Sequence, residues 1–471
     1  MLFANHTPGA IRLQHRLRAL AFLLLLAGCL LLSAYRLTLP HWHAATAGNQ
    51  LIITFHPALN DRDAARSAVA LREQFGMQGL RELTPLSIDS AHPVYLADLA
   101  PRVDAAELAA TLAASPLVAQ AEPNAPRQTL AIDERAGPLD TEFIAQEYYN
   151  DIGIVAMWSR GLTGSNPDSP VTVAVIDTGV DLDHPDIDAN VVPGFDFVED
   201  DDLAQDVSSN SHGSSVAGII SAEINNDLDG VGRARGVAGI GGGDAQDKTP
   251  GLQLMPLRIV ADKSGALSCA TIAEAIDYAR THGAQVINIS IGGAEPCTLE
   301  QAAIERAYTD GIAVVAAAGN GNSAAPFYPA AYGAGTADAM VIAVAGVNTD
   351  GVKAARSNYG SWVDIAAPFQ DIRTLSADGG YLTRNGTSFS APFVSGLLGV
   401  LMSNYGWSRD EAVAAILTTA DNLDSVNPDY AGLLGAGRIN ADRASALFAD
   451  YATNSAPANR HTVHLPLIVQ E

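Results

Sequence analysis

The chain has 471 residues, more than one typical domain, so we expect it to fold as two or three units. Hydrophobic residues make up 48% of the sequence, enough for a large core, and 52 acidic against 27 basic side chains give a net charge of −25. This charge suits a soluble protein that binds cations and argues against nucleic acid as a partner, because binding to a phosphate backbone needs clustered Lys and Arg.

Residues 1–47 have the pattern of an export signal or membrane anchor. Basic residues precede an apolar run at 19–35, which is the length of a signal core and marginal for a membrane span. The small residues AATA at 44–47 suit ordinary cleavage, whereas LAGC resembles a lipoprotein box ending at Cys29. Three leucines after Cys29 are unusual for a lipoprotein, so we favour secretion or a retained anchor. We expect a secreted or cell-surface protein that contacts membrane only through this segment.

Residues 48–125 predict a small α+β domain. Strand patterns occur at 51–57, 94–99 and 116–124, and amphipathic helix patterns at 61–75 and 104–115. A domain of this size is within the range that folds alone. The segment 126–140, with proline and glycine among charged residues, is expected to be a linker.

Residues 141–448 alternate between strand and helix patterns. Continuous apolar runs lie at 171–177, 252–260, 284–290, 312–320 and 340–347, and helix patterns at 269–283 and 299–311 end at glycine. Apolar runs of this kind suit strands that are covered on both faces. We therefore expect a doubly wound α/β domain with a mainly parallel sheet. For the tail 449–471, a short strand, a sorting tail and disorder all remain open.

Two cysteines remain after the signal segment, Cys269 and Cys297. In an exported chain such a pair favours one disulfide that closes a loop of modest length. Two free buried thiols are the alternative, because sequence alone cannot test how far apart the sulfurs lie. Metal binding by two thiols alone is not expected.

Polar residues at the ends of predicted elements predict one functional site. Asp177, Ser290 and Asn320 end predicted strands, and parallel sheets bind ligands beyond the carboxyl ends of their strands. His212 and Ser388 precede apolar helices, whose N-termini offer unpaired amide donors and favour negative charge. Each residue also has a structural alternative as a turn or a helix cap, and spacing alone does not select them.

Five motifs in chain order resemble those of the subtilisin-like serine peptidases: VAVIDTGVDLDHPD, SHGSSVAG, VINISIGG, AVVAAAGN and NGTSFSAPFVSG. The resemblance covers about residues 145–446 and keeps the order Asp, His, Ser. It implies a monomeric, secreted endopeptidase with a subtilisin-like fold that acts on polypeptides. It also implies that the preceding domain is a ferredoxin-like inhibitory propeptide, removed by self-processing between Glu122 and Asp140.

The resemblance implies a role for each matching residue. Ser388 would be the nucleophile, His212 the base that takes its proton, and Asp177 the group that orients the imidazole. The Asn320 side chain and the Ser388 backbone amide would receive the oxyanion.

The resemblance also implies two segments that hold the peptide substrate, one of them by pairing as an added strand. That segment is Ser290, Ile291 and Gly292, and it would line the primary specificity pocket together with Ala317, Ala318 and Gly319. Phe327 stands near the base of this pocket in relatives. Pointing inward it would shorten the pocket and favour small residues before the cut, and pointing outward it would pack into the core.

Calcium is the cofactor that the resemblance implies. The residues implied for a tight site are Asp186, Asn226, Asp227 and Asp229, which supply the oxygen ligands that calcium requires. The residues implied for a weaker second site are Asp196, Asp201 and Gln205. A solvated acidic loop is the alternative for this second set.

The sequence departs from the family after His212. Gly-Thr-His is usual there, whereas this chain has Gly213, Ser214 and Ser215, so we expect looser packing around the histidine. Phe393 also replaces a common histidine. Neither change removes a catalytic atom. Two rival functions are a catalytically silent binding module and a calcium-stabilised surface protein, but neither needs the four catalytic residues that this chain retains.

Overall fold

The computed structural model describes residues 50–56, 61–83, 94–101, 103–124, 126–129, 142–164, 166, 168–228, 234–243, 251–261, 267–333 and 340–454. The chain divides into a unit of residues 1–45, which lies outside these ranges, and a unit of residues 46–471. The expected signal segment, Asp229 and the end of the tail also fall outside the described residues. Within the described ranges, no helix is both long and apolar enough to span a bilayer.

The N-terminal part of the second unit is an α+β domain. Its described residues form four antiparallel strands in the order β2-β3-β1-β4. The elements are β1 (Gln50–Phe55), α2 (Asp61–Phe75), β2 (Gly79–Glu82), β3 (Val94–Asp98), α3 (Ala105–Ala113) and β4 (Val118–Pro123). Leu51, Ile53 and Phe55 of β1 are buried in a cluster with residues of both helices, which cover one face of the sheet.

The larger domain is built on a parallel sheet. As far as the described residues show, seven strands pair in the order β16-β15-β14-β12-β6-β10-β7. Their bounds are β6 (Thr172–Asp177), β7 (Phe195–Asp196), β10 (Gln253–Arg258), β12 (Val286–Ile289), β14 (Ala313–Ala317), β15 (Ile342–Val347) and β16 (Ile365–Pro368). After β6, the chain places β7 and β10 on one side of it, and then β12, β14, β15 and β16 in turn on the other. Such a reversal opens a ligand site beyond the carboxyl ends of the two strands.

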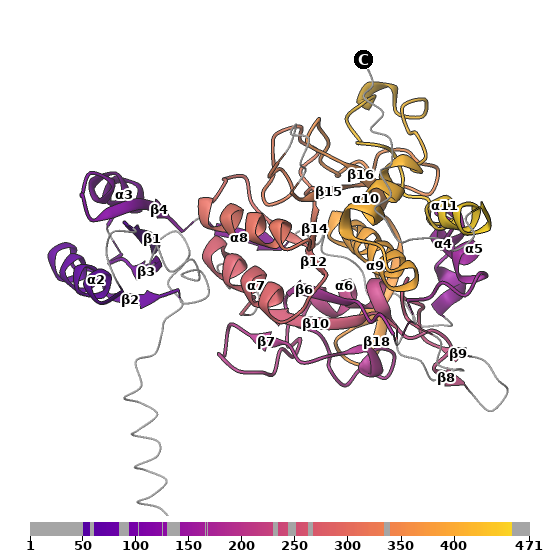
Figure 1. Ribbon diagram of the computed structural model, residues 1–471, viewed down its shortest axis with the longest axis horizontal. Coiled ribbons are helices and arrows are strands. Elements are labelled where there is room, and N and C mark those ends of the chain that lie inside the picture. The colour runs from indigo at the N-terminus through magenta and orange to yellow at the C-terminus, as the bar shows by residue number, and fades with distance from the viewer. Residues whose placement is uncertain are drawn as a thin grey trace, which may run out of the picture. The chain divides into compact units, whose positions relative to one another are not determined.

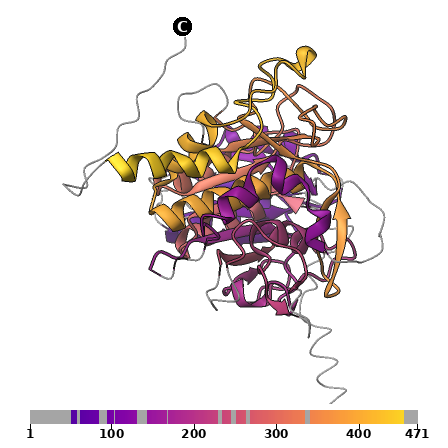
Figure 2. The same ribbon diagram turned by 90° about the vertical axis from the view of Figure 1, so that its right-hand side faces the viewer.

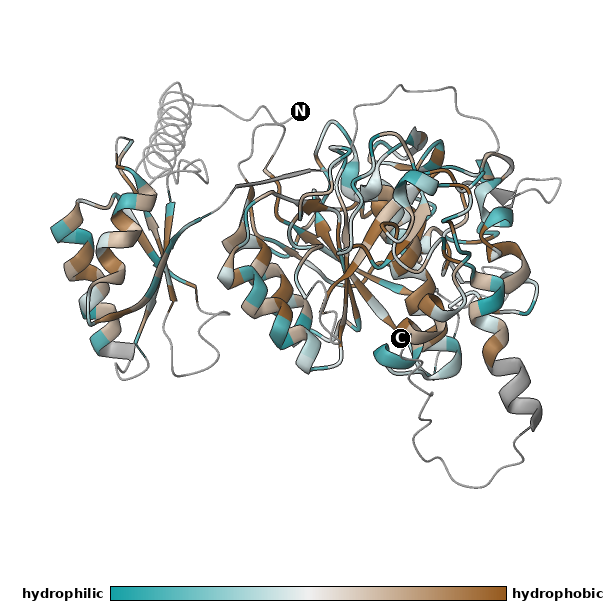
Figure 3. Cartoon of the chain, turned by 90° about the horizontal axis from the view of Figure 1, so that it is seen from above, coloured by the Kyte–Doolittle hydropathy of each residue, from teal (hydrophilic) through white to brown (hydrophobic). Residues whose placement is uncertain are grey.

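Helices cover both faces of this sheet. Figure 1 shows α6 (His212–Ser221) and α9 (Thr387–Tyr405) on one side, and α7 (Cys269–Thr281) and α8 (Thr298–Thr309) on the other. Alternate residues of β6 divide accordingly, because Val173 packs with the first pair and Ala174 with the second. The strands are therefore apolar on both faces, and Figure 3 shows hydrophobic residues gathered along them.

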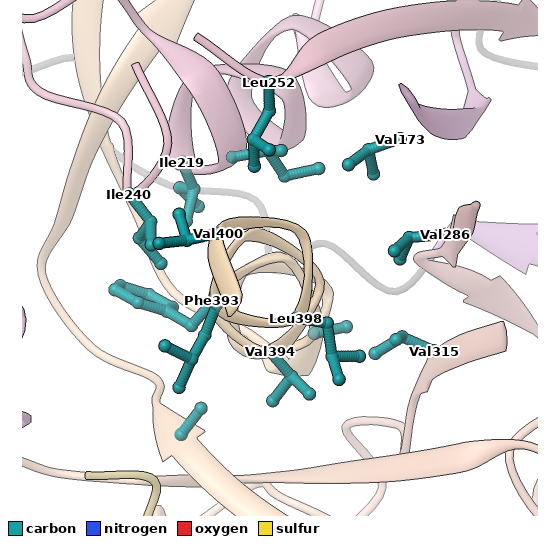
Figure 4. Close-up of a cluster of buried hydrophobic side chains, with 14 of the residues drawn as sticks. Val173, Ile219, Ile240, Leu252, Val286, Val315, Phe393, Val394, Leu398 and Val400 are labelled. Atoms are coloured by element: carbon teal, nitrogen blue, oxygen red, sulfur yellow. The ribbon is translucent and has the colours of Figure 1, made fainter. Parts of the chain in front are cut away.

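Helix α9 is the centre of one hydrophobic layer. Every residue from Thr387 to Ser403 is buried, as expected for a helix that is apolar all round. Figure 4 shows α9 end-on, with Phe393, Val394 and Leu398 surrounded by side chains from α6 and the sheet. The C-terminal helix α11 (Ala441–Asn454), yellow in Figure 2, is tied to the same domain by a hydrogen bond from the Ala441 N–H to the Ile152 carbonyl.

The remaining elements are short. They are β5 (Pro126–Thr129), η3 (Glu142–Ala145), α4 (Tyr148–Asp151), α5 (Ile154–Trp158), η4 (Asp188–Asn190), β8 (Asp227–Leu228), β9 (Ala234–Arg235), β11 (Leu267–Ser268), β13 (Ile291–Gly292), β17 (Ile372–Ser376), β18 (Gly380–Arg384), α10 (Arg409–Thr418) and η5 (Pro428–Tyr430). The expected doubly wound α/β domain with a parallel sheet is confirmed. Strand β5 differs from expectation, because it lies in the segment that the sequence predicts as a linker.

Candidate active site

Asp177 and His212 form a buried hydrogen-bonded pair. Asp177 is the last residue of β6 and His212 the first of α6, and Nδ1 of the imidazole lies 2.6 Å from Oδ1 of the carboxylate. Both side chains are inaccessible to solvent. When the N–H at Nδ1 donates this hydrogen bond to Asp177, the lone pair of the neutral imidazole lies on Nε2. Nε2 is buried and has no hydrogen-bond partner among the described residues. This nitrogen can accept a proton.

Ser388 lies beside this pair at the start of α9. The next residue is Phe389, and the centre of its ring lies 5.3 Å from the centre of the His212 imidazole. The Ser388 Oγ donates to the Ser290 carbonyl at 3.2 Å, and the Ser290 Oγ donates to the Ser388 carbonyl at 2.7 Å. These contacts hold the start of α9 against the end of β12. Ser388 is fully buried, and its hydroxyl bonds to Ser290 in this arrangement.

Asn320 is oriented by the residue before Ser388. Its Oδ1 accepts hydrogen bonds from the Thr387 N–H at 3.0 Å and from the Thr387 hydroxyl at 3.1 Å. These two bonds identify Oδ1 and place the amide donor, Nδ2, at the other branch of the side chain. The structure thus brings together the four residues that the sequence predicts. Asp177 ends β6, His212 and Ser388 lie in the first turns of α6 and α9, and Asn320 lies in the loop three residues after the end of β14.

The segment 290–292 pairs with an extended strand, which is the chain's own β5. Among the described residues, β5 is the middle strand of a small antiparallel sheet with the order β11-β5-β13. Ile291 lies opposite Thr129 and Gly292 opposite Gln128, while Leu267 lies opposite Arg127. Strands β11 and β13 thus flank the extended β5 on its two sides, and we call the position between these two wall strands the peptide channel.

Phe327 lies against both segments that are expected to form the specificity pocket. A Cβ added to Gly292 would be 2.6 Å from its Cε1, and one added to Gly319 would be 3.3 Å from its Cγ. The ring therefore lies next to the backbone of both segments, and it also contacts the two large hydrophobic clusters. Ala317 and Ala318 are buried in this region.

Asp186 has the environment of a cation ligand. Its Oδ2 accepts the Val237 N–H at 2.9 Å, whereas Oδ1 is buried and accepts no hydrogen bond of standard geometry from the described residues. Burial raises the pKa of this carboxyl to about 8, although the Val237 N–H opposes the rise. Asn226 lies beside it, with Nδ2 donating to the Pro185 carbonyl at 2.7 Å. A buried carboxylate without a counter-charge fits a bound cation.

The second predicted set of metal ligands is engaged in internal contacts. Asp196 pairs with Arg258, and its Oδ1 accepts the Val198 N–H at 2.8 Å. Asp201 accepts the Leu203 N–H at 2.8 Å, and Gln205 donates to Asp181 at 3.0 Å. Arg258 was not foreseen, and it already neutralises the most buried carboxylate of the set. The described residues hold no cluster of three or more His, Cys, Asp or Glu side chains suited to a metal, so this site and the one at Asp186 both stay predictions.

Ser214 and Ser215 are tightly bound rather than loosely packed. The Ser214 Oγ donates to Oδ2 of Asp206 at 2.8 Å and accepts the Asp181 N–H at 3.0 Å. The Ser215 Oγ lies 2.7 Å from the Ser211 carbonyl. Burial raises the pKa of the Asp206 carboxyl, and the hydrogen bonds from Ser208 and Ser214 oppose that rise. Sequence reasoning missed Asp206, which no motif distinguishes from the other acidic residues nearby.

Comparison with known proteins decides the family. Residues 168–437, more than half of the chain, match the model of the subtilase family. This chain belongs to the subtilase family. It is 36% identical over 334 residues to the thermophilic serine proteinase of Bacillus sp. strain AK1, and the match covers 69% of this subtilase and 72% of that protein. It is 37% identical over 276 residues to thermitase of Thermoactinomyces vulgaris, and the match covers 59% of this chain and 88% of thermitase.

A solved structure supports the fold. Fervidolysin from Fervidobacterium pennivorans, described as a keratinolytic enzyme related to subtilisin, matches with a TM-score of 0.64 and 22% identity. The match covers 84% of this subtilase and 60% of the fervidolysin chain. The subtilisin-like α/β fold is thus confirmed, and the protein is a subtilisin-like serine endopeptidase that acts on polypeptides.

The hydrogen bonds of Ser214 yield a stability prediction. Ser214→Ala should lower the free energy of unfolding by about 1–3 kcal/mol, because the Asp181 N–H loses its acceptor and the buried Asp206 loses a donor. Ser214→Thr keeps the hydroxyl and should remain close to the wild type. Denaturant unfolding, with a serine-peptidase inhibitor present to prevent self-digestion, measures both. Equal stability of the alanine variant and the wild type would contradict this account.

Proposed function

We propose that this subtilase is a secreted endopeptidase that uses Asp177, His212 and Ser388 as a catalytic triad and is made as a self-inhibited precursor. The observation that carries the proposal is the buried Asp177–His212 pair, whose imidazole lies next to the first turn of α9, the turn that contains Ser388. A serine hydroxyl needs such a base, because it is not appreciably ionised at neutral pH.

The first half of the reaction forms an acyl-enzyme. As substrate enters, the Ser388 hydroxyl turns from the Ser290 carbonyl to Nε2 of His212 and attacks the substrate carbonyl carbon while its proton passes to Nε2. Catalytic hydrogen bonds often tighten only in the substrate complex. Asp177 stabilises the resulting imidazolium through Nδ1. The oxyanion accepts hydrogen bonds from the Ser388 amide and from Nδ2 of Asn320.

The second half releases the products. The imidazolium gives its proton to the leaving amine as the tetrahedral intermediate collapses to the acyl-enzyme. Water then attacks the ester carbonyl and gives a proton to Nε2, and the same proton returns to Ser388 as the acid leaves. The triad and the oxyanion donors are therefore returned to their starting state.

The N-terminal domain contacts the helices α7 and α8 of the larger domain. Ile52 and Leu96, on the face of its sheet opposite α2 and α3, share a hydrophobic cluster with residues of α7 and α8. At the N-terminus of α7, the Ala270 N–H donates to Oδ1 of Asn124 at 3.2 Å. At the N-terminus of α8, Glu122 accepts a hydrogen bond from the Thr298 hydroxyl. These contacts support the assignment of residues 48–125 as a propeptide that directs β5 into the channel.

The register of β5 points to the bond that is cut in maturation. Thr129 lies opposite Ile291, so in antiparallel pairing the next residue in the sequence corresponds to Ser290. The Ser290 carbonyl accepts the hydrogen bond of Ser388, which identifies this position as the one next to the nucleophile. Leu130 lies outside the described residues, but the count predicts cleavage between Leu130 and Ala131, within the expected range.

Self-processing tests the proposed function. The wild-type chain should yield a mature protein that begins at Ala131 and reacts with a fluorophosphonate probe, because Ser388 is activated by His212. Ser388→Ala should stay at precursor length and remain unlabelled. Intact-mass measurement and N-terminal sequencing give the result, provided that other proteases are inhibited during purification.

Ser390→Ala is the matched control, since Ser390 lies in the same buried helix and its hydroxyl bonds to the Pro368 carbonyl at 2.9 Å. It should be processed and labelled like the wild type. Normal maturation of Ser388→Ala would refute the triad. A labelled enzyme whose N-terminus lies elsewhere would refute only the assigned bond.

The position of Phe327 predicts the substrate preference. With its ring against Gly292 and Gly319, the pocket should accept small to medium aliphatic residues before the cut and disfavour large aromatic ones. Phe327→Gly should raise kcat/KM for a substrate with Phe before the cut, relative to one with Ala, by roughly 10–200-fold. Phe327→Tyr, which keeps the ring, should leave this ratio low. Preferential cleavage after aromatic residues by the wild type would show that the ring does not fill the pocket.

Calcium is the proposed structural cofactor, with Asp186 and Asn226 among its ligands and Asp227 and Asp229 nearby in sequence. A chelator should lower the unfolding temperature of the wild type, because a ligand at about 100 times its Kd stabilises by about 2.7 kcal/mol. Asp186→Asn should unfold at the lower temperature with or without chelator. Asp350→Asn, which changes a residue in an exposed loop, should show the same fall in unfolding temperature with chelator as the wild type. An Asp186→Asn variant that still loses stability on chelation would place the calcium elsewhere.

A further inference from the structure

The disulfide between Cys269 and Cys297 lies at the base of both walls of the peptide channel. Cys269 directly follows the wall strand β11, and Cys297 lies a few residues beyond the other wall strand, β13. The Cα atoms of the two cysteines are 6.4 Å apart, and both side chains are buried. The bond therefore joins the segment that begins α7 to the segment that precedes α8.

The two walls do not pair with each other in the described part of the chain. Strands β11 and β13 each pair with β5, which lies between them. An extended peptide has to meet both walls at one fixed separation, because neighbouring strands lie about 4.7–4.9 Å apart. Besides β5, the packing of α7 against α8 and the disulfide connect the two wall segments.

The wall that contains β13 has a second anchor. Gly293 and Tyr328 exchange backbone hydrogen bonds of 2.8 Å in both directions. A little further along, the Cys297 N–H donates to the Tyr332 hydroxyl at 2.6 Å, and this hydroxyl lies 3.0 Å from Oε2 of Glu300. Both ends of the segment from β13 to α8 are thus attached to residues 328–332. Through Cys297, the disulfide connects β11 to this anchored segment.

We propose that the Cys269–Cys297 disulfide is a positioning cross-link that holds β11 at the distance from β13 required by extended polypeptides. It acts on the binding of residues that span both walls and leaves the chemistry at Ser388 unchanged. The physical reason is preorganisation, because a wall that is already placed loses less conformational freedom when the peptide binds. The inference rests on the proposed function, in which this channel binds the acyl side of the substrate.

The test compares the mature enzyme with its disulfide intact and reduced by dithiothreitol, with alkylation and mass measurement to verify the state of both cysteines. The first substrate is a peptide amide with four residues before the cut, long enough to reach β11. The second is an ester of the same final residue alone, which occupies only the pocket beside Ser388. A fluorophosphonate probe reports the reactivity of Ser388.

Reduction should lower kcat/KM for the four-residue substrate by about tenfold, mainly through a higher KM, because ordering a loop on binding weakens affinity by about this factor. The ester and the probe should react as before, and removal of the reductant should restore the peptide activity. The double variant Cys269→Ala/Cys297→Ala should behave like the reduced enzyme and show no response to dithiothreitol.

Two results would overturn the cross-link proposal. One is an unchanged ratio of peptide to ester activity after verified reduction. The other is an equal loss of peptide, ester and probe reactivity, which would mean that the bond supports the domain as a whole. Failure of the oxidised protein to react with the probe is a separate outcome, and it would refute the proposed catalytic function instead.

Discussion

The hydrogen bond between Asp177 and His212 depends on how closely helix α6 approaches the end of strand β6. Gly213 makes this approach possible, because a Cβ there would lie 2.1 Å from the Gly179 carbonyl oxygen and 3.1 Å from the Asp177 Cβ. The close contact buries both partners, and a hydrogen bond is electrostatically stronger in such a low-dielectric environment. It also fixes which imidazole nitrogen is available to Ser388. The chemistry of the site therefore depends on the packing of a helix on a sheet.

Ser290 links this chemistry to the binding of the peptide. Its carbonyl accepts the Ser388 hydroxyl, and the two residues after it form the wall strand β13. In the proposed mechanism, a peptide that pairs with β13 is thereby brought into register with Ser388. The chain's own β5 uses the same pairing, and its covalent attachment gives it a high effective concentration beside β13. In the proposed maturation, cutting this connection would remove the advantage and let other polypeptides compete.

Much of the fold could be predicted from the sequence because it follows from local rules. The apolar run at 171–177 became β6, since a strand covered on both faces carries no polar alternation. The placement of Asp177 at the carboxyl edge of the sheet followed from the geometry of parallel sheets, and that of His212 from its position before an apolar helix. Strand β5 could not be predicted, because its residues pair with β11 and β13 rather than following a strand pattern of their own.

Contacts between residues distant in sequence also limited what could be predicted from the sequence. The pairing of Asp196 with Arg258 joins residues that no motif connects, so the sequence alone could not indicate that this carboxylate has a counter-charge. The direction of the Phe327 ring and the separation of the two cysteine sulfurs likewise depend on the folded chain. The family resemblance supplied roles for the residues of the motifs, but it carried no information about partners outside those motifs.

The replacement of the usual Thr and His by Ser214 and Ser215 shows how such partners act. Smaller side chains next to His212 should leave space, yet both serines are fully buried. The side chain of Arg384, from the β17–β18 hairpin and 169 residues later in the sequence than Ser215, reaches this region. Its Nε donates to the Ser215 hydroxyl at 3.2 Å. Its guanidinium lies 5.9 Å from the centre of the Phe389 ring, the ring that also contacts His212. The imidazole is therefore held by a continuous set of contacts, although the residues that make them differ from the usual motif.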